Sequence, residues 1–164
     1  MAAIKVGSKA PVFKLPEMGG TIHALEAALT KGPVLLAFFK VECPTCQFAV
    51  PFIDRLYRQF QGTGASVWGI SQDDAAASRD FASEFSASFP ILIDKKPYEV
   101  SKCYGIEYTP TLFLIDTNAK VRLTGDGFSK GDLLDAQKWL SQASATAPGE
   151  LFLPHERVPE FKPG

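Results

Sequence analysis

The chain has 164 residues, of which 46% are hydrophobic and 21% charged, and its 17 basic and 18 acidic side chains give a formal net charge of −1. This length and composition are typical of one globular domain with its own core. A nucleic-acid partner is not expected, because there is neither a basic excess nor a clustered basic face. The longest apolar run, 34–39, is far shorter than the roughly 20 residues that cross a bilayer, so no membrane partner is expected either.

The first residues and the cysteine count bear on location. Residues 1–7 lack the apolar segment after a basic start that marks a secretory signal, so we expect a cytoplasmic protein. The alternative is a periplasmic or anchored protein from which such a segment has been trimmed. Three cysteines are an odd number, and a secreted domain held by disulfides would normally have more.

Hydrophobic periodicity predicts strands that alternate with helices. Residues 1–32 are an irregular lead-in with an extended piece at 12–15 and a short helix at 24–29. The continuous apolar run 33–41 indicates a strand buried on both faces. The other expected strands are 65–71, 90–94, 111–116 and 120–125, and the other expected helices are 44–60, 73–89, 97–104 and 129–145. This order predicts an α/β fold, with a mixed central sheet flanked by helices.

Two expected helices carry recognisable caps and faces. Asp73 or Asp74 is the expected N-cap of the helix 73–89, and Ser129 that of the last helix. The spacing of apolar residues in the last helix predicts that one face of it points inward. The residues expected on that face are Leu133, Leu134, Ala136, Trp139 and Leu140.

The sequence divides into a domain at 1–145 and a Pro-rich C-terminal extension at 146–164. Four prolines exclude regular structure from the extension, which also carries apolar residues such as Leu151 and Phe161. We expect it to lie extended against its own domain. Packing on a partner subunit and disorder are the alternatives.

The sequence Cys43-Pro44-Thr45-Cys46 joins the expected buried strand to the start of an amphipathic helix. A helix N-terminus has unpaired N–H groups and the positive end of the helix dipole, which stabilise a thiolate. Pro44 suits the first helical turn because its missing N–H would have no partner there. Two intervening residues in helical geometry bring the two sulfurs within reach of a disulfide. We therefore expect Cys43 to attack a disulfide and Cys46 to resolve it.

A structural zinc site is the first alternative for these cysteines. Such a site needs four ligands, usually from two pairs, and this chain has one pair. Cys103, His23 and His155 are scattered without ligand spacing. No metal and no cofactor are therefore expected.

A proline opens the expected strand 111–116, which is unusual because proline removes a backbone donor from the sheet. With this Thr109-Pro110 element and the CPTC sequence, stretches 38–60 and 104–116 resemble the thioredoxin superfamily. The lead-in at 6–16 resembles the redoxin branch, which holds AhpC/TSA peroxiredoxins and TlpA/ResA-like reductases. The resemblance extends over roughly residues 5–145.

The resemblance implies a thioredoxin-like fold, with an extra helix–strand insertion near 73–94. It implies that Pro110 is a cis-proline facing the sulfurs, and that Thr109 contacts substrate through its backbone. Pro44 and Thr45 complete the expected substrate-binding residues. The chain departs from thioredoxins at Ala37 and Glu42, which replace a buried acid and a tryptophan, and from peroxiredoxins at Lys40, which replaces Thr or Ser.

The sequence therefore predicts a thiol–disulfide oxidoreductase with a redox-active Cys43–Cys46 pair. Its expected partners are a disulfide-containing protein or small thiol, and an external thiol reductant or oxidant that resets the pair. A thiol peroxidase that uses Cys43, and a non-catalytic thiol- or metal-binding module of the same fold, are the alternative functions. Outside the pair, Cys103 is expected to be a small buried hydrophobe, Asp94 a capping residue and His155 a solvated one.

Overall fold

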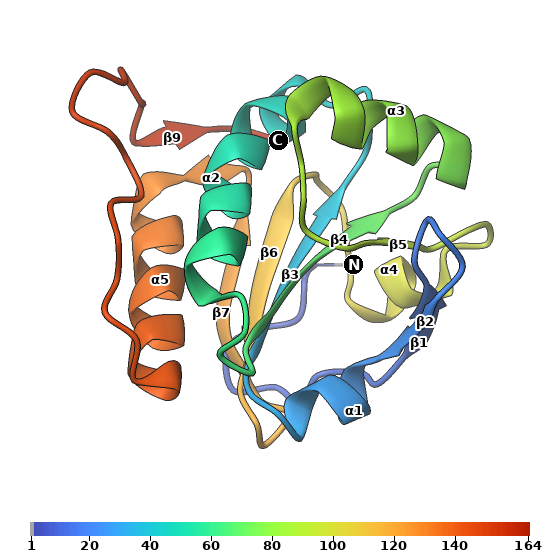
Figure 1. Cartoon of the computed structure of the whole chain (residues 1–164). Coiled ribbons are helices and arrows are strands. Elements are labelled where there is room, and N and C mark those ends of the chain that lie inside the picture. The colour runs from blue at the N-terminus through green and yellow to red at the C-terminus, as the bar shows by residue number, and fades with distance from the viewer. Residues whose placement is uncertain (1) are drawn as a thin grey trace.

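The computed structural model describes residues 2–164 and is built on a five-stranded sheet of order β5-β4-β3-β6-β7 (Figure 1). β3 pairs in parallel with β4, and β4 with β5, whereas β6 is antiparallel to both β3 and β7. The sheet is mixed and helices flank it, as the sequence predicts. The strands are β3 (Val34–Phe39), β4 (Ser66–Ser71), β5 (Ile91–Ile93), β6 (Thr111–Ile115) and β7 (Val121–Asp126).

The central strand β3 is buried on both faces, which explains its uninterrupted apolar sequence. Its side chains alternate between two clusters, because successive residues of a strand point to opposite faces. Leu35, Ala37 and Phe39 join one core cluster, and Val34, Leu36 and Phe38 join the other. The sheet therefore divides the core into two layers.

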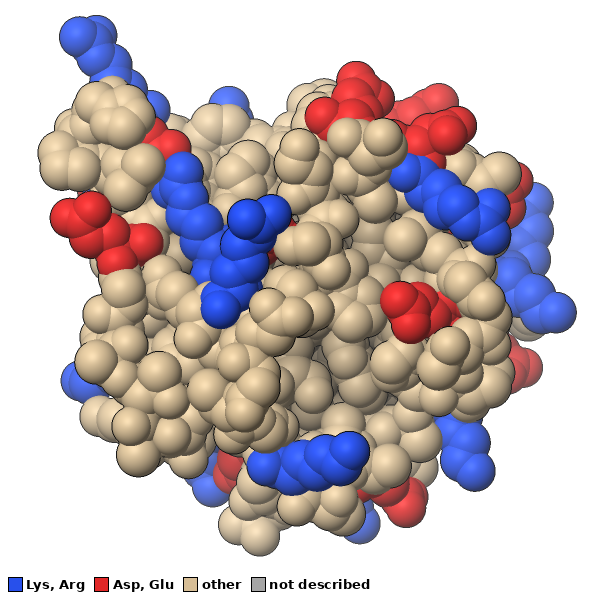
Figure 2. All heavy atoms as spheres, in the orientation of Figure 1, with Lys and Arg blue, Asp and Glu red and all other residues tan. Residues whose placement is uncertain are grey.

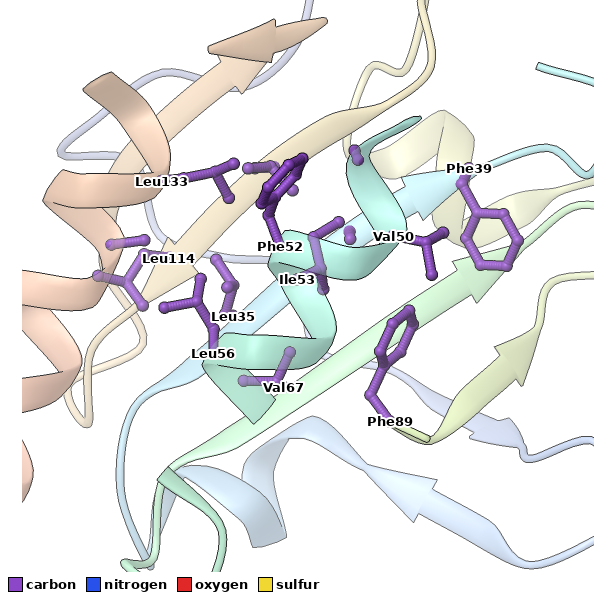
Figure 3. Close-up of a cluster of buried hydrophobic side chains, with 14 of the residues drawn as sticks. Leu35, Phe39, Val50, Phe52, Ile53, Leu56, Val67, Phe89, Leu114 and Leu133 are labelled. Carbon is purple, nitrogen blue, oxygen red and sulfur yellow. The ribbon is translucent and has the colours of Figure 1, made fainter. Parts of the chain in front are cut away.

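The first layer contains α2 (Pro44–Phe60), α3 (Ala75–Phe85) and α5 (Lys130–Ser144). Figure 3 shows Ile53 and Leu56 of α2 pointing toward Leu35 and Val67 on the sheet, and Leu133 of α5 pointing toward Phe52 of α2. Because α2 is fixed along its length by this packing, its first turn has a defined position at the carboxyl end of β3.

The second layer contains α1 (Leu25–Leu29), α4 (Glu99–Cys103) and the hairpin of β1 (Lys14–Pro16) and β2 (Ile22–Ala24). Tyr104 is fully buried at its centre, and its hydroxyl donates to the carbonyl of Pro11 at 2.7 Å. Among residues 2–164, no helix is both long and apolar enough to cross a bilayer. On the face of the molecule that Figure 2 shows, basic and acidic side chains are both present, and neither sign covers the whole face.

Two expectations about the helices need correction. α3 ends at Phe85, before the expected 89, because Ser86 takes a left-handed conformation with φ of 57°. Asp74 is its N-cap, and accepts a hydrogen bond from the amide of Ala77 at 2.8 Å. On α5, Ser129 is the N-cap as predicted, but Leu134 and Trp139 are 43% and 39% exposed. The buried stripe of α5 is narrower than predicted, and these two side chains lie on its flanks.

The C-terminal extension, residues 146–164, lies against α2 and α5. Leu151 is buried in the first core layer, and Arg55 of α2 makes a bidentate ion pair with Glu156 at 2.7 and 2.6 Å. Near its end, the strand β9 (Phe161–Lys162) pairs with β8 (Phe128–Ser129). The prolines do not exclude all regular structure from the extension, contrary to the sequence prediction, because a two-residue strand fits between Pro159 and Pro163.

Truncating Leu56 tests whether α2 is held by the core. Leu56→Ala should lower the free energy of unfolding by about 2–5 kcal/mol, because the side chain is fully buried and its loss leaves a cavity. Leu134→Ala on the exposed flank of α5 is the matched control, with a change of about 0.5 kcal/mol or less. Urea unfolding followed by circular dichroism measures both, and equal losses would contradict the packing described here.

Glu156→Gln tests the attachment of the extension. The hydrogen bonds from Arg55 lower the pKa of Glu156 from 4.5 to about 2. A lowered carboxyl pKa means that the ion pair stabilises the attachment above about pH 4.5 and loses this effect as the pH falls toward 2. At neutral pH the variant should show faster hydrogen exchange in residues 150–160 than the parent. The difference should shrink in acid, and a difference that grows in acid would refute the assignment.

Candidate active site

The two cysteines predicted to react lie where β3 ends and α2 begins. Cys43 is the N-cap of α2 in an extended conformation, and Pro44 occupies the first turn as predicted. The backbone N–H of Cys46 donates to Sγ of Cys43 at 3.1 Å. Both cysteines are free thiols, with Cys43 half-buried and Cys46 only 2% exposed. The sulfur of Cys43 therefore accepts a hydrogen bond from an N–H group in the first turn of α2, and the Cys43 side chain is partly accessible to solvent.

The second half of the site comes from the loop before β6. The Thr109–Pro110 peptide bond is cis, and Pro110 is buried at the start of β6. The carbonyl oxygen of Thr109 accepts a hydrogen bond from Sγ of Cys43 at 3.3 Å. Since β6 is the direct neighbour of β3, the sheet itself brings these two segments together.

Burial makes the two thiols chemically unequal. Removal from water is the main cause that raises the pKa of the Cys46 thiol, and its hydrogen bond with Cys43 raises it further. A raised thiol pKa keeps Cys46 protonated at neutral pH, so it is not the ready nucleophile of the pair. The arrangement suits an accessible attacking sulfur on Cys43 and a protected second sulfur on Cys46.

Two polar side chains that the sequence analysis did not place at the active site hold the loop before Cys43. The carboxylate of Asp73 accepts from the backbone N–H of Val41 at 2.9 Å, and Gln47 Nε2 donates to the carbonyl of Val41 at 2.9 Å. Asp73, one of the two expected helix caps, thus binds the active-site loop instead. Its position just after β4, the parallel neighbour of β3, is the sequence signal that could have found it.

The remaining sequence candidates lie apart from the two cysteines. Asp94 is buried and accepts from the amide and hydroxyl of Ser101 at 2.8 and 2.7 Å, so it binds α4 from outside the helix, while Tyr98 is the N-cap residue. Cys103 is exposed on α4, and the prediction of a buried hydrophobe was wrong. His155 is exposed in the extension, as expected. Among the described residues, no three His, Cys, Asp or Glu side chains form a group able to hold a metal ion.

Comparison with known proteins identifies the group to which this arrangement belongs. Residues 6–124 match the sequence profile of the AhpC/TSA family. The chain belongs to the AhpC/TSA family. Over 121 residues it is 36% identical to the thiol-disulfide oxidoreductase ResA of Geobacillus thermodenitrificans (strain NG80-2), covering 73% of this chain and 68% of that relative. Within the family it is therefore a ResA-like thiol–disulfide oxidoreductase with a CxxC pair, Cys43 and Cys46.

Solved structures show the same thioredoxin-like fold. A Chlorobium tepidum protein, provisionally described as a thiol:disulfide interchange protein DsbE, matches with a TM-score of 0.75 and 27% identity over 87% of this chain and 99% of that one. Peroxidoxin BcpB of Mycobacterium tuberculosis matches with a TM-score of 0.72 and 28% identity, over 85% and 97% of the two chains. The predicted fold class is confirmed.

Alkylation of the reduced protein tests the inequality of the thiols. With iodoacetamide at about pH 8, Cys43 and the exposed Cys103 should be modified first, because the reagent attacks thiolates and both side chains are accessible. Cys46 should react at least about tenfold more slowly, since its raised pKa leaves little thiolate. Peptide mass mapping measures the three rates, and urea-unfolded protein, in which they should converge, is the control. Equal rates in the folded protein would contradict the assignment.

Proposed function

We propose that this oxidoreductase works through the Cys43–Cys46 couple, with Cys43 as the attacking sulfur and Cys46 as the resolving one. The observation that carries the proposal is the position of Cys43 Sγ, which caps α2 and contacts both the Cys46 amide and the Thr109 carbonyl. A donor at the helix N-terminus stabilises a thiolate, and the accessible side of the sulfur is available to a substrate.

The reaction then has two exchange steps. The Cys43 thiolate attacks one sulfur of a substrate disulfide, which forms a mixed disulfide and releases the other substrate sulfur as a thiolate. Cys46 next loses its proton, its sulfur attacks Sγ of Cys43, and the second substrate sulfur leaves as a thiol. The Cys43–Cys46 disulfide that remains is reduced by an external thiol, or the steps run in reverse with an external oxidant. No bound cofactor takes part in either direction.

The loop Thr109–Pro110 and the turn Pro44–Thr45 are the proposed substrate contacts. The carbonyl of Thr109 contacts the sulfur of Cys43, Pro110 follows Thr109 in a cis peptide bond, and Pro44, the next residue after Cys43, is exposed. The substrate class is a disulfide-containing protein or a small thiol, and a reductase and an oxidase role remain alternatives because the potential of the couple decides between them. A cytoplasmic location stays a prediction.

A peroxide-reducing activity is the second candidate, favoured by the similarity to peroxidoxin BcpB. Peroxiredoxins bind the peroxide oxygens with a Thr or Ser hydroxyl near the reactive cysteine, and this chain has the exposed Lys40 at that place. We therefore favour disulfide exchange.

Single cysteine variants test the proposed roles. Cys43→Ser should abolish exchange with a substrate disulfide, because it removes the attacking sulfur. Cys46→Ser should accumulate a mixed disulfide on Cys43 that intact-mass spectrometry detects. Cys103→Ser is the matched control and should keep the parent rate. Exchange by Cys43→Ser at the parent rate would refute the assignment.

Oxidation by hydrogen peroxide separates the two candidate functions. The reduced Cys103→Ser protein should be oxidised at about the rate of an ordinary thiol of the same thiolate content, because peroxide-binding hydroxyls are missing from the position of Lys40. Stopped-flow tryptophan fluorescence on the Cys103→Ser protein measures this rate. A rate many orders of magnitude above that of free cysteine would favour the peroxidase.

A further inference from the structure

The end of the C-terminal extension lies on the active site. The hydroxyl of Thr45, inside the CPTC sequence, donates to the carbonyl of Pro163 at 2.6 Å. Gly164 packs so closely on Thr109 that a Cβ at this position would collide with the Thr109 carbonyl oxygen. That oxygen also accepts from the sulfur of Cys43. In Figure 1, β9 accordingly leads the chain to the first turn of α2.

We call residues 161–164 the closing segment, and we call the space between β8 and α2 that it fills the groove. Along one side it forms a strand, in which Lys162 pairs with Phe128 and Phe161 with Ser129. Along the other side, Nζ of Lys162 lies 4.5 Å from the ring centre of Phe48 on α2. Gly127 leaves room for it, since a Cβ there would come within 2.6 Å of the Lys162 carbonyl oxygen. The last residue of the closing segment, Gly164, lies against Thr109.

These contacts are of the kind by which a protein binds an extended polypeptide. A strand edge supplies backbone hydrogen bonds, and neighbouring side chains contact alternate residues of the added strand. A polypeptide that brings a disulfide to Cys43 along this edge would need the same positions beside β8, Thr45 and Thr109. The closing segment and such a substrate therefore exclude each other.

We propose that the groove of β8, Thr45, Phe48 and Thr109 is the binding site for an extended polypeptide substrate, and that the closing segment occupies it as an internal pseudo-substrate. This inference rests on the proposed function of the Cys43–Cys46 pair. The segment must leave the groove before a polypeptide disulfide reaches Cys43. The rate of exchange with polypeptides is therefore proportional to the fraction of time for which the closing segment is out of the groove.

The closing segment can leave without detaching the rest of the extension. Phe161 is 54% exposed, and the segment is held by a two-residue strand pairing, the hydroxyl of Thr45, one cation–ring contact and the packing of Gly164 on Thr109. Upstream, Leu151 and the Arg55–Glu156 ion pair hold the extension independently. The release therefore involves only the segment beside the sulfurs.

A shortened chain that ends at Glu160 tests the proposal, because it keeps Leu151 and Glu156. Its second-order rate constant should rise about tenfold for a short unstructured peptide whose single cysteine is disulfide-linked to glutathione, equivalent to about 1.4 kcal/mol. With glutathione disulfide, which does not need the strand edge, the rise should be smaller. A peptide of residues 158–164 should inhibit the shortened chain competitively, and a scrambled peptide should not.

Two point variants of the full chain provide a second, milder test. Lys162→Ala, which removes the contact with Phe48, should raise the rate with the peptide substrate. Arg157→Ala, which removes an exposed cation of the extension outside the groove, should not. Equal rates for full and shortened chains, or an equal rise with both disulfides, would overturn the inference and leave the proposed function standing. If neither chain exchanged with glutathione disulfide, the proposed function would fail, and this inference with it.

Discussion

The hydrogen bonds at the sulfur of Cys43 are the feature on which the rest of this site depends. One comes from the amide of Cys46 in the first turn of α2, and the other goes to the carbonyl of Thr109 before β6. Cys43 and Thr109 are 66 residues apart in sequence. Their meeting requires that β3 and β6 be neighbours in the sheet and that α2 begin directly where β3 ends.

The core fixes both conditions. β3 is buried on both faces between two layers, and α2 packs into one layer through side chains along its whole length. Asp73 and Gln47 then hold the loop at Val41 from two sides. The buried Cys46 is fixed as part of this packing, whereas Cys43 at the helix N-cap keeps an accessible side. The difference between the two thiols thus follows from where the helix begins.

The sequence was sufficient for the features that local patterns encode. Three local patterns predicted the main elements and the reactive pair. They are the continuous apolar run of β3, the helical spacing after Pro44 and the proline at the start of β6. Short strands such as β8 and β9 were not predicted, because two residues are too few to show a hydrophobic periodicity. Leu134 and Trp139 were misplaced because apolar spacing does not show how wide a buried stripe is; adjacent helix positions differ by about 100°.

Long-range contacts account for what the sequence could not show. The hydroxyl of Thr45 meets the carbonyl of Pro163 across 118 residues, and no local pattern around either residue predicts that pairing. Cys103 was taken for a core residue on its residue type alone, although the short helix α4 buries Ser101 against Asp94 and leaves Cys103 outside. In both cases the contacts and the burial of the residue depend on which surfaces the fold brings together.

A redox titration of the Cys103→Ser protein in glutathione or dithiothreitol buffers measures whether Cys43 and Cys46 form a reversible redox couple. We expect one two-electron couple, with a tenfold change in the reduced-to-oxidised ratio per about 30 mV. Mass mapping of the oxidised form should find a disulfide between Cys43 and Cys46. Absence of a reversible couple, or a thiol pair that stays reduced across the whole range, would contradict this expectation.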